Sequence, residues 1–203
     1  MKELSKKTQF YIKEYGPHSH VSYKIVKESM KILIFASIMS SLGGLFIEKI
    51  KVLIFSVIPM IILLPYLNNM IGNFGTIIAT KFSTYLHEGK IDKKWWRSQA
   101  LIRLFIQILI IALFMSTVSA LVALLITSAK YPMESDFAYK IFAIAILDVL
   151  ILVNIMFFTS IIAGFHFYKK NEDPNNFLIP ITTSISDFGN MLVLSLLVIY
   201  FFK

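Results

Sequence analysis

The chain has 203 residues, of which 57% are hydrophobic and only 16% are charged. Soluble domains contain about 45–50% apolar and roughly 25% charged residues, so this composition excludes a soluble enzyme and indicates a membrane protein. The length accommodates one domain of about four to six membrane spans. The absence of cysteine excludes disulfides, thiolate metal sites and cysteine nucleophiles. In a membrane protein, a net charge of +8 indicates Lys- and Arg-rich cytoplasmic loops rather than nucleic-acid binding.

The first 24 residues are polar and basic, and they predict a cytosolic tail. This segment is not a secretory signal peptide, because its positive region is too long and no cleavage site of small residues follows the apolar run. We expect one transmembrane domain at 25–203. Its first apolar run, 32–47, is short for a span of about 20 residues. The helix should therefore begin upstream, near Val21, and we place its apolar part at about 25–47.

Four further apolar runs predict four more helices, at about 52–86, 99–128, 138–168 and 177–202. The run at 52–86 contains Pro59 and Pro65 and is too long for one straight span, which predicts a tilted or broken helix. Asp173 followed by Pro174 is a helix-start pattern in which Asp is the N-cap. The predicted fold class is an all-α polytopic membrane protein with five transmembrane helices. Continuous apolar runs, rather than alternating ones, exclude a β-barrel.

Charge near the predicted helix ends gives the orientation. With the N-terminus inside, 15 of the 20 Lys and Arg residues fall in inner segments and 5 in outer segments. This difference predicts an N-in, C-out protein. The basic loop at 87–97 contains Trp95 and Trp96, and indole rings prefer the membrane interface.

Polar residues recur at steps of three and four along the second predicted helix. They are Asn69, Asn73, Thr76, Thr80, Ser83, Thr84 and His87. These steps place the side chains on one face of a helix, and Gly72 and Gly75 in the same stretch allow close backbone approach. Such a stripe is typical of the hydrophilic lining of an ion path, and also of an ordinary helix–helix contact, where small and hydroxyl residues are common.

The last predicted helix has a similar pattern, in which Pro180, Thr183, Ser184, Asp187 and Asn190 share a face. Asp187 falls near mid-membrane, and its span contains no basic residue that could pair with it. A carboxylate at that depth must be protonated, hydrated in a cavity or bound to a cation. We therefore interpret Asp187 as a cation site, with a protonated structural Asp as the alternative.

Asp148, on the fourth helix, is the other intramembrane acid. Its neighbours in the sequence are aliphatic apart from Asn154, which favours a structural role. Catalytic patterns are missing from the sequence, including H-E-x-x-H, G-x-S-x-G and the acidic clusters of membrane phosphotransferases. We therefore do not expect an enzyme.

Two segments resemble the family of MgtE-type magnesium channels and transporters. Residues 65–75, P-Y-L-N-N-M-I-G-N-F-G, are similar to the proline and G-N-x-G motif on the second membrane helix of that family. Residues 173–187 are similar to its D-P-x-N-x-x-x-P-x-x-T-x-x-x-D motif, which enters the last helix. The resemblance covers about 25–203, and it is closest to the short, archaeal-like form that is only a membrane domain.

The resemblance implies roles for individual residues. Asp187 matches the pore carboxylate that faces its symmetry mate and binds hydrated Mg²⁺. Thr183 matches a position whose backbone carbonyl faces the ion, and Asp173 matches an acid at the cytoplasmic pore mouth. Gly72, Asn73 and Gly75 match the pore-lining motif. With the two polar stripes, the expected lining also includes Thr76, Thr80, Pro180, Ser184 and Asn190.

The chain departs from the family pattern in places. Full-length bacterial members carry cytoplasmic N and CBS domains that close the pore, and we expect no such gate in this short form. Ile77 stands where the family often has Gln, and Arg103 replaces an acid near the start of the third helix. The second departure argues against peripheral cytosolic metal sites.

Elementary chemistry agrees with a magnesium path. Mg²⁺ gives up water reluctantly and is usually held by one or two carboxylates with waters retained. One Asp187 cannot neutralise a divalent ion in a low-dielectric pore, whereas two can, and a two-fold axis supplies two from one type of chain. The lining offers oxygen ligands, which suit a hard cation.

The sequence thus predicts a multi-pass protein of the cell membrane that transports a divalent cation, foremost Mg²⁺, at a homodimer interface lined by helices two and five. Besides the ion and the lipid bilayer, the expected partner is a second copy, and nucleic acid is not expected. One alternative is a Na⁺- or H⁺-coupled Mg²⁺ exchanger, whose flux would need the coupling gradient. Another is a half-subunit that pairs with a sister half. Selectivity among Mg²⁺, Mn²⁺, Co²⁺, Ca²⁺ and Ni²⁺ stays open at this point.

Overall fold

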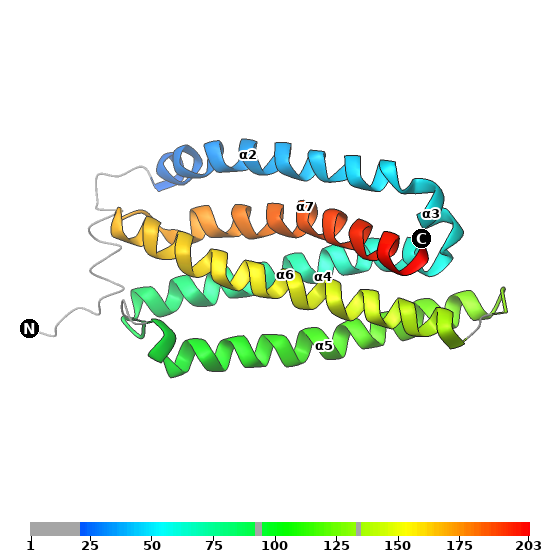
Figure 1. Ribbon diagram of the computed structural model, residues 1–203. Coiled ribbons are helices and arrows are strands. Elements are labelled where there is room, and N and C mark those ends of the chain that lie inside the picture. Colours follow the sequence, from blue (N-terminus) through cyan, green and yellow to red (C-terminus); the bar gives the residue numbers. More distant parts are fainter. Residues whose placement is uncertain (1–20, 92–94, 133–134) are drawn as a thin grey trace, which may run out of the picture.

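The computed structural model describes residues 21–91, 95–132 and 135–203 (Figure 1). Almost all of the predicted basic tail therefore lies outside the described residues. The helices are α2 (Val21–Lys49), α3 (Lys51–Ser56), α4 (Ile58–His87), the 3-10 turn η1 (Trp95–Arg97), α5 (Gln99–Ser128), α6 (Ser135–Lys169) and α7 (Pro174–Phe202). Five of these helices are long and apolar enough to cross a membrane. The prediction of a five-helix, all-α membrane protein is confirmed.

Proline and capping residues set the ends of several helices. The predicted second helix is broken at Val57, two residues before Pro59, into the short α3 and the 30-residue α4. Because 30 residues at about 1.5 Å each exceed a hydrocarbon core of about 30 Å, α4 must tilt or extend beyond the membrane. α7 begins three residues earlier than the apolar run indicates, at Pro174, with the Asp173 carboxylate as the predicted N-cap. Its Oδ1 accepts a hydrogen bond from the Asn175 backbone N–H over 3.0 Å.

α7 is the central helix of the bundle. It packs against α2 on one side and against α4 and α6 on the other, and α5 closes the far side against α4 and α6 (Figure 1). Among the described helices, α2 packs only against α7 and the short α3. The core is made mainly of large apolar side chains from α4 and α6, including Leu67, Ile71, Phe82, Leu152 and Met156.

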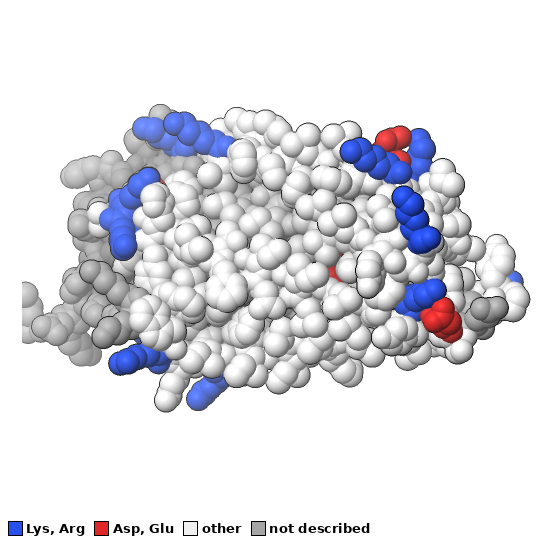
Figure 2. All heavy atoms as spheres, in the orientation of Figure 1, with Lys and Arg blue, Asp and Glu red and all other residues white. Residues whose placement is uncertain are grey.

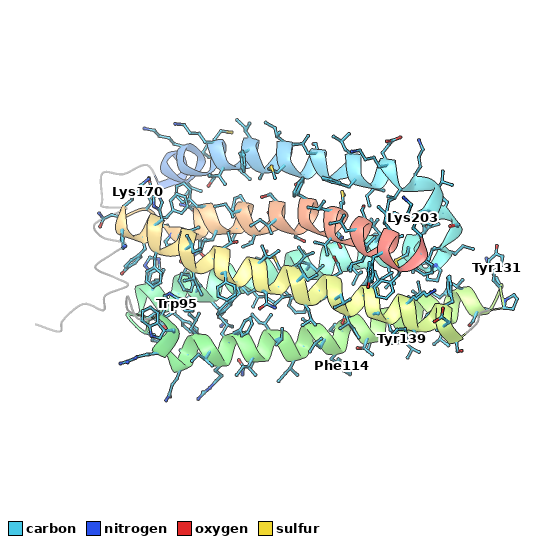
Figure 3. All side chains as sticks on the ribbon, in the orientation of Figure 1. Trp95, Phe114, Tyr131, Tyr139, Lys170 and Lys203 are labelled. Carbon is cyan, nitrogen blue, oxygen red and sulfur yellow. The ribbon has the colours of Figure 1, made fainter. Side chains whose placement is uncertain are left out.

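The surface of the bundle matches a membrane environment. Lys and Arg, with some Asp and Glu, gather toward the two ends of the view, and the band between them is white apart from one small acidic spot (Figure 2). Trp95 and Lys170 lie at one end of the bundle, and Tyr131 and Lys203 lie at the other (Figure 3). α5 exposes large apolar side chains such as Phe114 along the band, where lipid would cover them. The N-in orientation stays a prediction from the charge count.

Candidate functional site

A polar cavity of about 480 Å³ lies between α4 and α7 at the middle of the bundle. α7 contributes Thr183, Asp187 and Met191, which follow one another at steps of four and so share a face. The α4 wall is formed by Leu64, Pro65, Asn68, Asn69, Gly72, Asn73 and Thr76. Amide, hydroxyl and carboxylate oxygens therefore converge at membrane depth.

The Asp187 carboxylate is fixed by two donors from two other helices. Asn68 Nδ2 donates to Asp187 Oδ1 over 2.8 Å, and Ser40 Oγ of α2 donates to Asp187 Oδ2 over 2.9 Å. Donors from two different helices hold the carboxylate in one orientation, because a hydrogen bond weakens steeply when its geometry is disturbed. Asp187 is only half-buried, so its remaining lone pairs are open to the cavity.

Small residues allow the helices to approach closely at this site. A Cβ on Gly43 of α2 would come within 3.1 Å of the Phe188 Cα and 2.9 Å of the Met191 Sδ on α7. The lack of a side chain at Gly43 therefore lets α2 lie close enough for Ser40 to reach Asp187. Gly72 similarly faces Ser186 of α7, at 3.4 Å from its ideal Cβ position to Oγ. Such contacts between small residues are the usual basis of helix association in membranes.

Pro180 also affects the packing of α2 on α7. A proline inside a helix has no N–H to donate to the carbonyl four residues earlier, which here belongs to Asn176. Ser29 Oγ of α2 donates to this Asn176 carbonyl over 3.3 Å. α2 is thus hydrogen-bonded to α7 at two places: Ser29 contacts it near its start, at Asn176, and Ser40 contacts it near its middle, at Asp187.

The polar face of α4 is exposed on the outside of the single chain. Asn69 and Asn73 are both exposed, although they lie in the middle of a membrane-spanning helix. The threonine hydroxyls along this face donate to carbonyls of their own helix, as Thr76 Oγ1 does to the Gly72 carbonyl over 3.1 Å. Such internal hydrogen bonds satisfy the hydroxyl hydrogens and leave the oxygen lone pairs facing outward.

The stripe predicted along α4 divides into two faces in the structure. Asn69, Asn73 and Thr76 line the cavity, whereas Ser83 and His87 are fully buried on the other side. The prediction of one continuous stripe is wrong here because the last turns of α4 are covered by the end of α6. The His87 ring packs edge-on against Tyr168 of α6, with ring centroids 5.5 Å apart.

Several other predicted lining residues do not border the cavity. Gly75 is buried, and its ideal Cβ position lies 2.7 Å from Met156 Sδ and 3.0 Å from Thr182 Cβ, so it serves helix packing. Thr80 lies on the outward face one turn beyond the cavity lining. Pro180, Ser184 and Asn190 are all buried. Periodicity predicts them beside Asp187 because polar residues cover a wide face of α7. Only a narrow part of that face, at Thr183, Asp187 and Met191, borders the cavity.

Asp173 lies apart from the cavity. It is only 7% exposed, it caps α7, and its Oδ1 lies 3.7 Å from His87 Nε2. A buried cap is a different position from the solvent-exposed rim that the resemblance implies. The role of Asp173 as a charge at the pore mouth stays a prediction.

Asn190 connects the two intramembrane acids. Its amide lies between Asn68 of α4, at 3.2 Å, and the Asp148 carboxyl group of α6, at 2.8 Å. Asp148 and Asn190 are both fully buried. The sequence had suggested Asn154 as the polar neighbour of Asp148, but Asn154 Nδ2 donates to the Leu150 carbonyl of its own helix.

Sequence reasoning missed two residues that contact Asp187. Asn68 is adjacent to the predicted stripe, and only its position in the 65–75 segment, four residues before the G-N-x-G motif, could have drawn attention to it. Ser40 lies on α2 among small residues, and their pattern does not indicate which helix they contact. Its contact with Asp187 becomes apparent only in the structure, where Gly43 packs closely against α7. Neither contact follows from periodicity within one helix.

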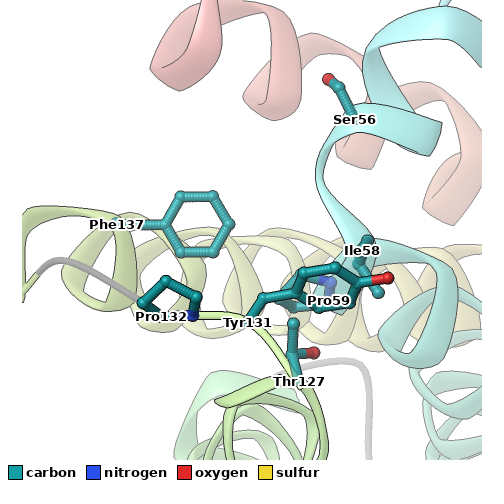
Figure 4. A pocket seen from close by; sticks show the side chains of 7 residues that line it. All are labelled: Ser56, Ile58, Pro59, Thr127, Tyr131, Pro132 and Phe137. Atoms are coloured by element: carbon teal, nitrogen blue, oxygen red, sulfur yellow. The ribbon is translucent and has the colours of Figure 1, made fainter. Parts of the chain in front are cut away.

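A second cavity, of about 360 Å³, lies at the end of the bundle near Tyr131. Its lining comes from the break between α3 and α4 and from the α5–α6 connection, and includes Pro59, Tyr131, Pro132 and Phe137 (Figure 4). Among the described residues, no acidic side chain borders it. The cavity at Asp187 differs in having a carboxylate in its described lining.

Comparison with known protein families matches residues 64–197 to the MgtE divalent cation transporter family. The chain belongs to this family. The matched segment contains every residue that lines the Asp187 cavity, and it leaves out all of α2, including Ser40. Comparisons with curated proteins and with solved structures found no match. The MgtE chain is therefore a divalent-cation transporter whose polar intramembrane cavity lies within the segment that defines the family.

Proposed function

We propose that this MgtE protein transports Mg²⁺ across the cell membrane through the cavity between α4 and α7, with Asp187 as the ion-binding carboxylate. The observation that carries the proposal is the Asp187 carboxylate itself, which lies near the middle of α7, receives hydrogen bonds from Asn68 and Ser40, and faces a cavity of about 480 Å³. A hydrogen-bonded carboxylate without a basic partner attracts a cation at this depth.

The cavity suits an ion that keeps most of its water. Within the described residues there is no group of three or more His, Cys, Asp or Glu side chains that could strip and hold a metal ion. One carboxylate surrounded by amides and hydroxyls instead offers hydrogen bonds to water molecules bound to the ion. Mg²⁺ usually keeps several waters and binds through one or two carboxylates, so this lining favours Mg²⁺ over an ion that needs full dehydration.

The proposed complete path lies between two copies of the chain. Asn69 and Asn73 are exposed on the outside of a membrane-spanning helix, where contact with lipid would cost free energy. A second copy related by a two-fold axis would place its own polar face of α4 against them and add a second Asp187. Two carboxylates would then neutralise one divalent ion. A sister half with a similar α4 face would meet the same requirement.

Flux into liposomes that contain only this protein tests the proposal. We expect Mg²⁺ uptake by the wild type and its loss in Asp187→Ala, because the ion then has no negative ligand in the cavity. Asp136→Ala is the matched control, since Asp136 lies in the first turn of α6 and pairs there with Lys140 over 2.8 Å. Undiminished uptake by Asp187→Ala would remove this carboxylate from the path.

The same liposomes separate the proposed channel from a coupled exchanger. A channel conducts Mg²⁺ down its own gradient, whereas an exchanger requires a Na⁺ or H⁺ gradient of the correct direction. Replacing Mg²⁺ in turn with Mn²⁺, Co²⁺, Ca²⁺ and Ni²⁺ measures selectivity. Greater flux of a more easily dehydrated ion would contradict the assignment of Mg²⁺ as the principal cargo.

A further inference from the structure

A chain of four polar side chains crosses the core from α6 to the cavity. Asp148 contacts Asn190 of α7, Asn190 contacts Asn68 of α4, and Asn68 Nδ2 donates to Asp187 Oδ1 over 2.8 Å. The first two members are fully buried. Nothing in the proposed ion path itself requires Asp148, so the connection between the two carboxyl groups needs its own explanation.

The direction of the hydrogen bonds in this chain depends on the proton of Asp148. In one orientation of the Asn190 amide, Nδ2 donates to Asn68 Oδ1 over 3.2 Å. The Asn190 oxygen then lies 2.8 Å from Asp148 Oδ2, and two oxygens approach so closely only when one carries a proton. With that proton on Asp148, each side-chain contact in the series from Asp148 to Asp187 pairs a donor with an acceptor, and Asn190 Nδ2 also lies 3.3 Å from the Asn68 backbone N.

The opposite orientation conflicts with the ion site. If Asp148 is ionised, Asn190 turns over and donates to Asp148 Oδ2 over 2.8 Å, which places its oxygen 3.2 Å from Asn68 Oδ1. The Asn68 backbone N–H lies 3.3 Å from that oxygen and can donate to it, whereas the contact with Asn68 Oδ1 is relieved only when Asn68 turns over as well. The Asn68 oxygen would then face Asp187 Oδ1, and Asp187 would lose its donor. In that arrangement, ionisation of Asp148 removes the hydrogen bond from Asn68 that orients the Asp187 carboxylate.

Within the described residues, no basic side chain forms an ion pair with Asp148. The titratable side chains on the helices packed against α6 are Tyr66, Lys81, Tyr85 and His87 on α4, Arg103 on α5, and Asp187 and Tyr200 on α7. Among them, only Asp187 is joined to Asp148, through the two amides. Asp148 Oδ1 has no hydrogen-bond donor in the described part of the chain. Burying a carboxylate in this way is costly, whereas a neutral carboxylic acid is tolerated.

We propose that Asp148 is a proton-binding site coupled to the cation site through Asn190 and Asn68. The bound proton sets the direction of both amides, and the amides present a donor to Asp187, which keeps its carboxylate oriented toward the ion. By linkage, a cation bound at Asp187 strengthens the hold on the proton at Asp148. This inference rests on the proposed function of Asp187, and it assigns Asp148 as a positioning residue that does not touch the ion.

Infrared spectroscopy of the purified protein tests the bound proton directly. We expect the carbonyl stretch of a protonated carboxylic acid in the wild type, and its loss in Asp148→Asn. Adding Mg²⁺ should shift this band in the wild type, because the ion acts on the same chain of hydrogen bonds, and the shift should disappear in Asn190→Leu. Asn154→Leu is the matched control on α6, where the band and its shift should both persist.

Two substitutions of Asp148 separate positioning from simple packing. Asp148→Leu should raise the Kd for Mg²⁺ about tenfold, because it leaves the buried Asn190 amide without its partner. Asp148→Asn should recover most of this loss, since its amide can donate to Asn190 as the protonated acid does. A band that survives Asp148→Asn, a band insensitive to Mg²⁺, or equal losses in the two variants would each overturn the proposal. Failure of the proposed function would give a different result from failure of this proposal. The wild type would then bind no Mg²⁺, although its infrared spectrum would still show the band of the protonated acid.

Discussion

Asp173 and Asp187 lie on the same helix and have different surroundings. Asp187 faces the cavity and receives hydrogen bonds from Asn68 and Ser40. Asp173 is buried at the first turn, where it caps α7 and lies beside His87. The D-P-x-N motif therefore contains a residue that starts the helix, and the same helix carries the candidate ion ligand farther along.

Substitutions at Asp173 should affect stability through the cap. Asp173→Ala removes the acceptor for the Asn175 N–H, and we expect the free energy of unfolding to fall by about 1 kcal/mol. Asp173→Asn should cost much less, because Asn is an equally good N-cap. Thermal unfolding in detergent, followed by circular dichroism, measures both.

Glu172→Ala is the control for this prediction, since it removes a neighbouring acid without removing the cap. If Asp173 instead serves as a charge at a pore mouth, Asp173→Asn should lower Mg²⁺ flux mainly at low ionic strength, because salt screens exposed charges. A flux that depends on salt in this way would contradict a purely structural role.

The sequence could predict which residues are unusual, but only in part which of them meet. Depth and the absence of a basic partner identify Asp187, and the Asp173-Pro174 pair predicts a cap that the structure confirms. Periodicity places Asn190 beside Asp187, yet Asn190 lies toward α6 and contacts Asp148. Contacts between helices depend on how each helix is rotated about its axis, and a pattern within one helix does not determine this.

At the scale of elements, α2 depends on α7 for its position. Among the described helices it packs only against α7 and α3, and Gly43 marks the closest approach. The sequence predicted the existence of this helix from an apolar run, but it could not show that its Ser40 reaches the Asp187 carboxylate. The break at Val57 was easier to predict, because Pro59 and the length of the run both exclude a straight helix.

Adjacent glycines of α2 offer a matched pair of substitutions. Gly43→Ala should destabilise the protein by about 1–3 kcal/mol, because the new Cβ would lie 3.1 Å from the Phe188 Cα, and a backbone atom cannot move aside cheaply. Gly44→Ala should be neutral or stabilising, since nothing lies within 4 Å of its Cβ position and Ala favours a helix.

The variants Gly43→Ala and Gly44→Ala also test whether the position of α2 affects the ion site. If α2 is displaced in Gly43→Ala, Ser40 no longer reaches Asp187, and Mg²⁺ affinity should change together with the melting temperature. In Gly44→Ala, Mg²⁺ affinity should stay at the wild-type value and the melting temperature should not fall. Equal behaviour of the two variants in thermal unfolding would contradict the close packing of α2 on α7.

At the scale of the whole molecule, the exposed polar face of α4 predicts how two copies meet. The chain contains no cysteine, so single cysteines can be introduced without a background. Ile77→Cys lies on this face and should form a disulfide-linked dimer on oxidation in the membrane. Phe114→Cys is the control, because Phe114 points outward from α5 on another side of the bundle (Figure 3).

Crosslinking through Phe114→Cys but not through Ile77→Cys would place the interface on α5 and contradict the proposed path. Crosslinking through neither position, together with a monomer in solution, would contradict the homodimer. The sister-half alternative predicts a link from Ile77→Cys only when the second type of chain is present.

Two facing Asp187 carboxylates would repel each other in a low-dielectric path unless a cation lies between them. A ligand that binds only the folded dimer stabilises it by mass action, increasingly so as its concentration exceeds the Kd. We therefore expect millimolar Mg²⁺ to raise the melting temperature of the purified wild type, and Asp187→Asn to lose most of this increment. Without metal, Asp187→Asn should melt higher than the wild type, because it removes the like-charge repulsion. A lone structural Asp predicts the opposite sign for this last effect, since Asp187→Asn would then only disturb the hydrogen bonds from Asn68 and Ser40.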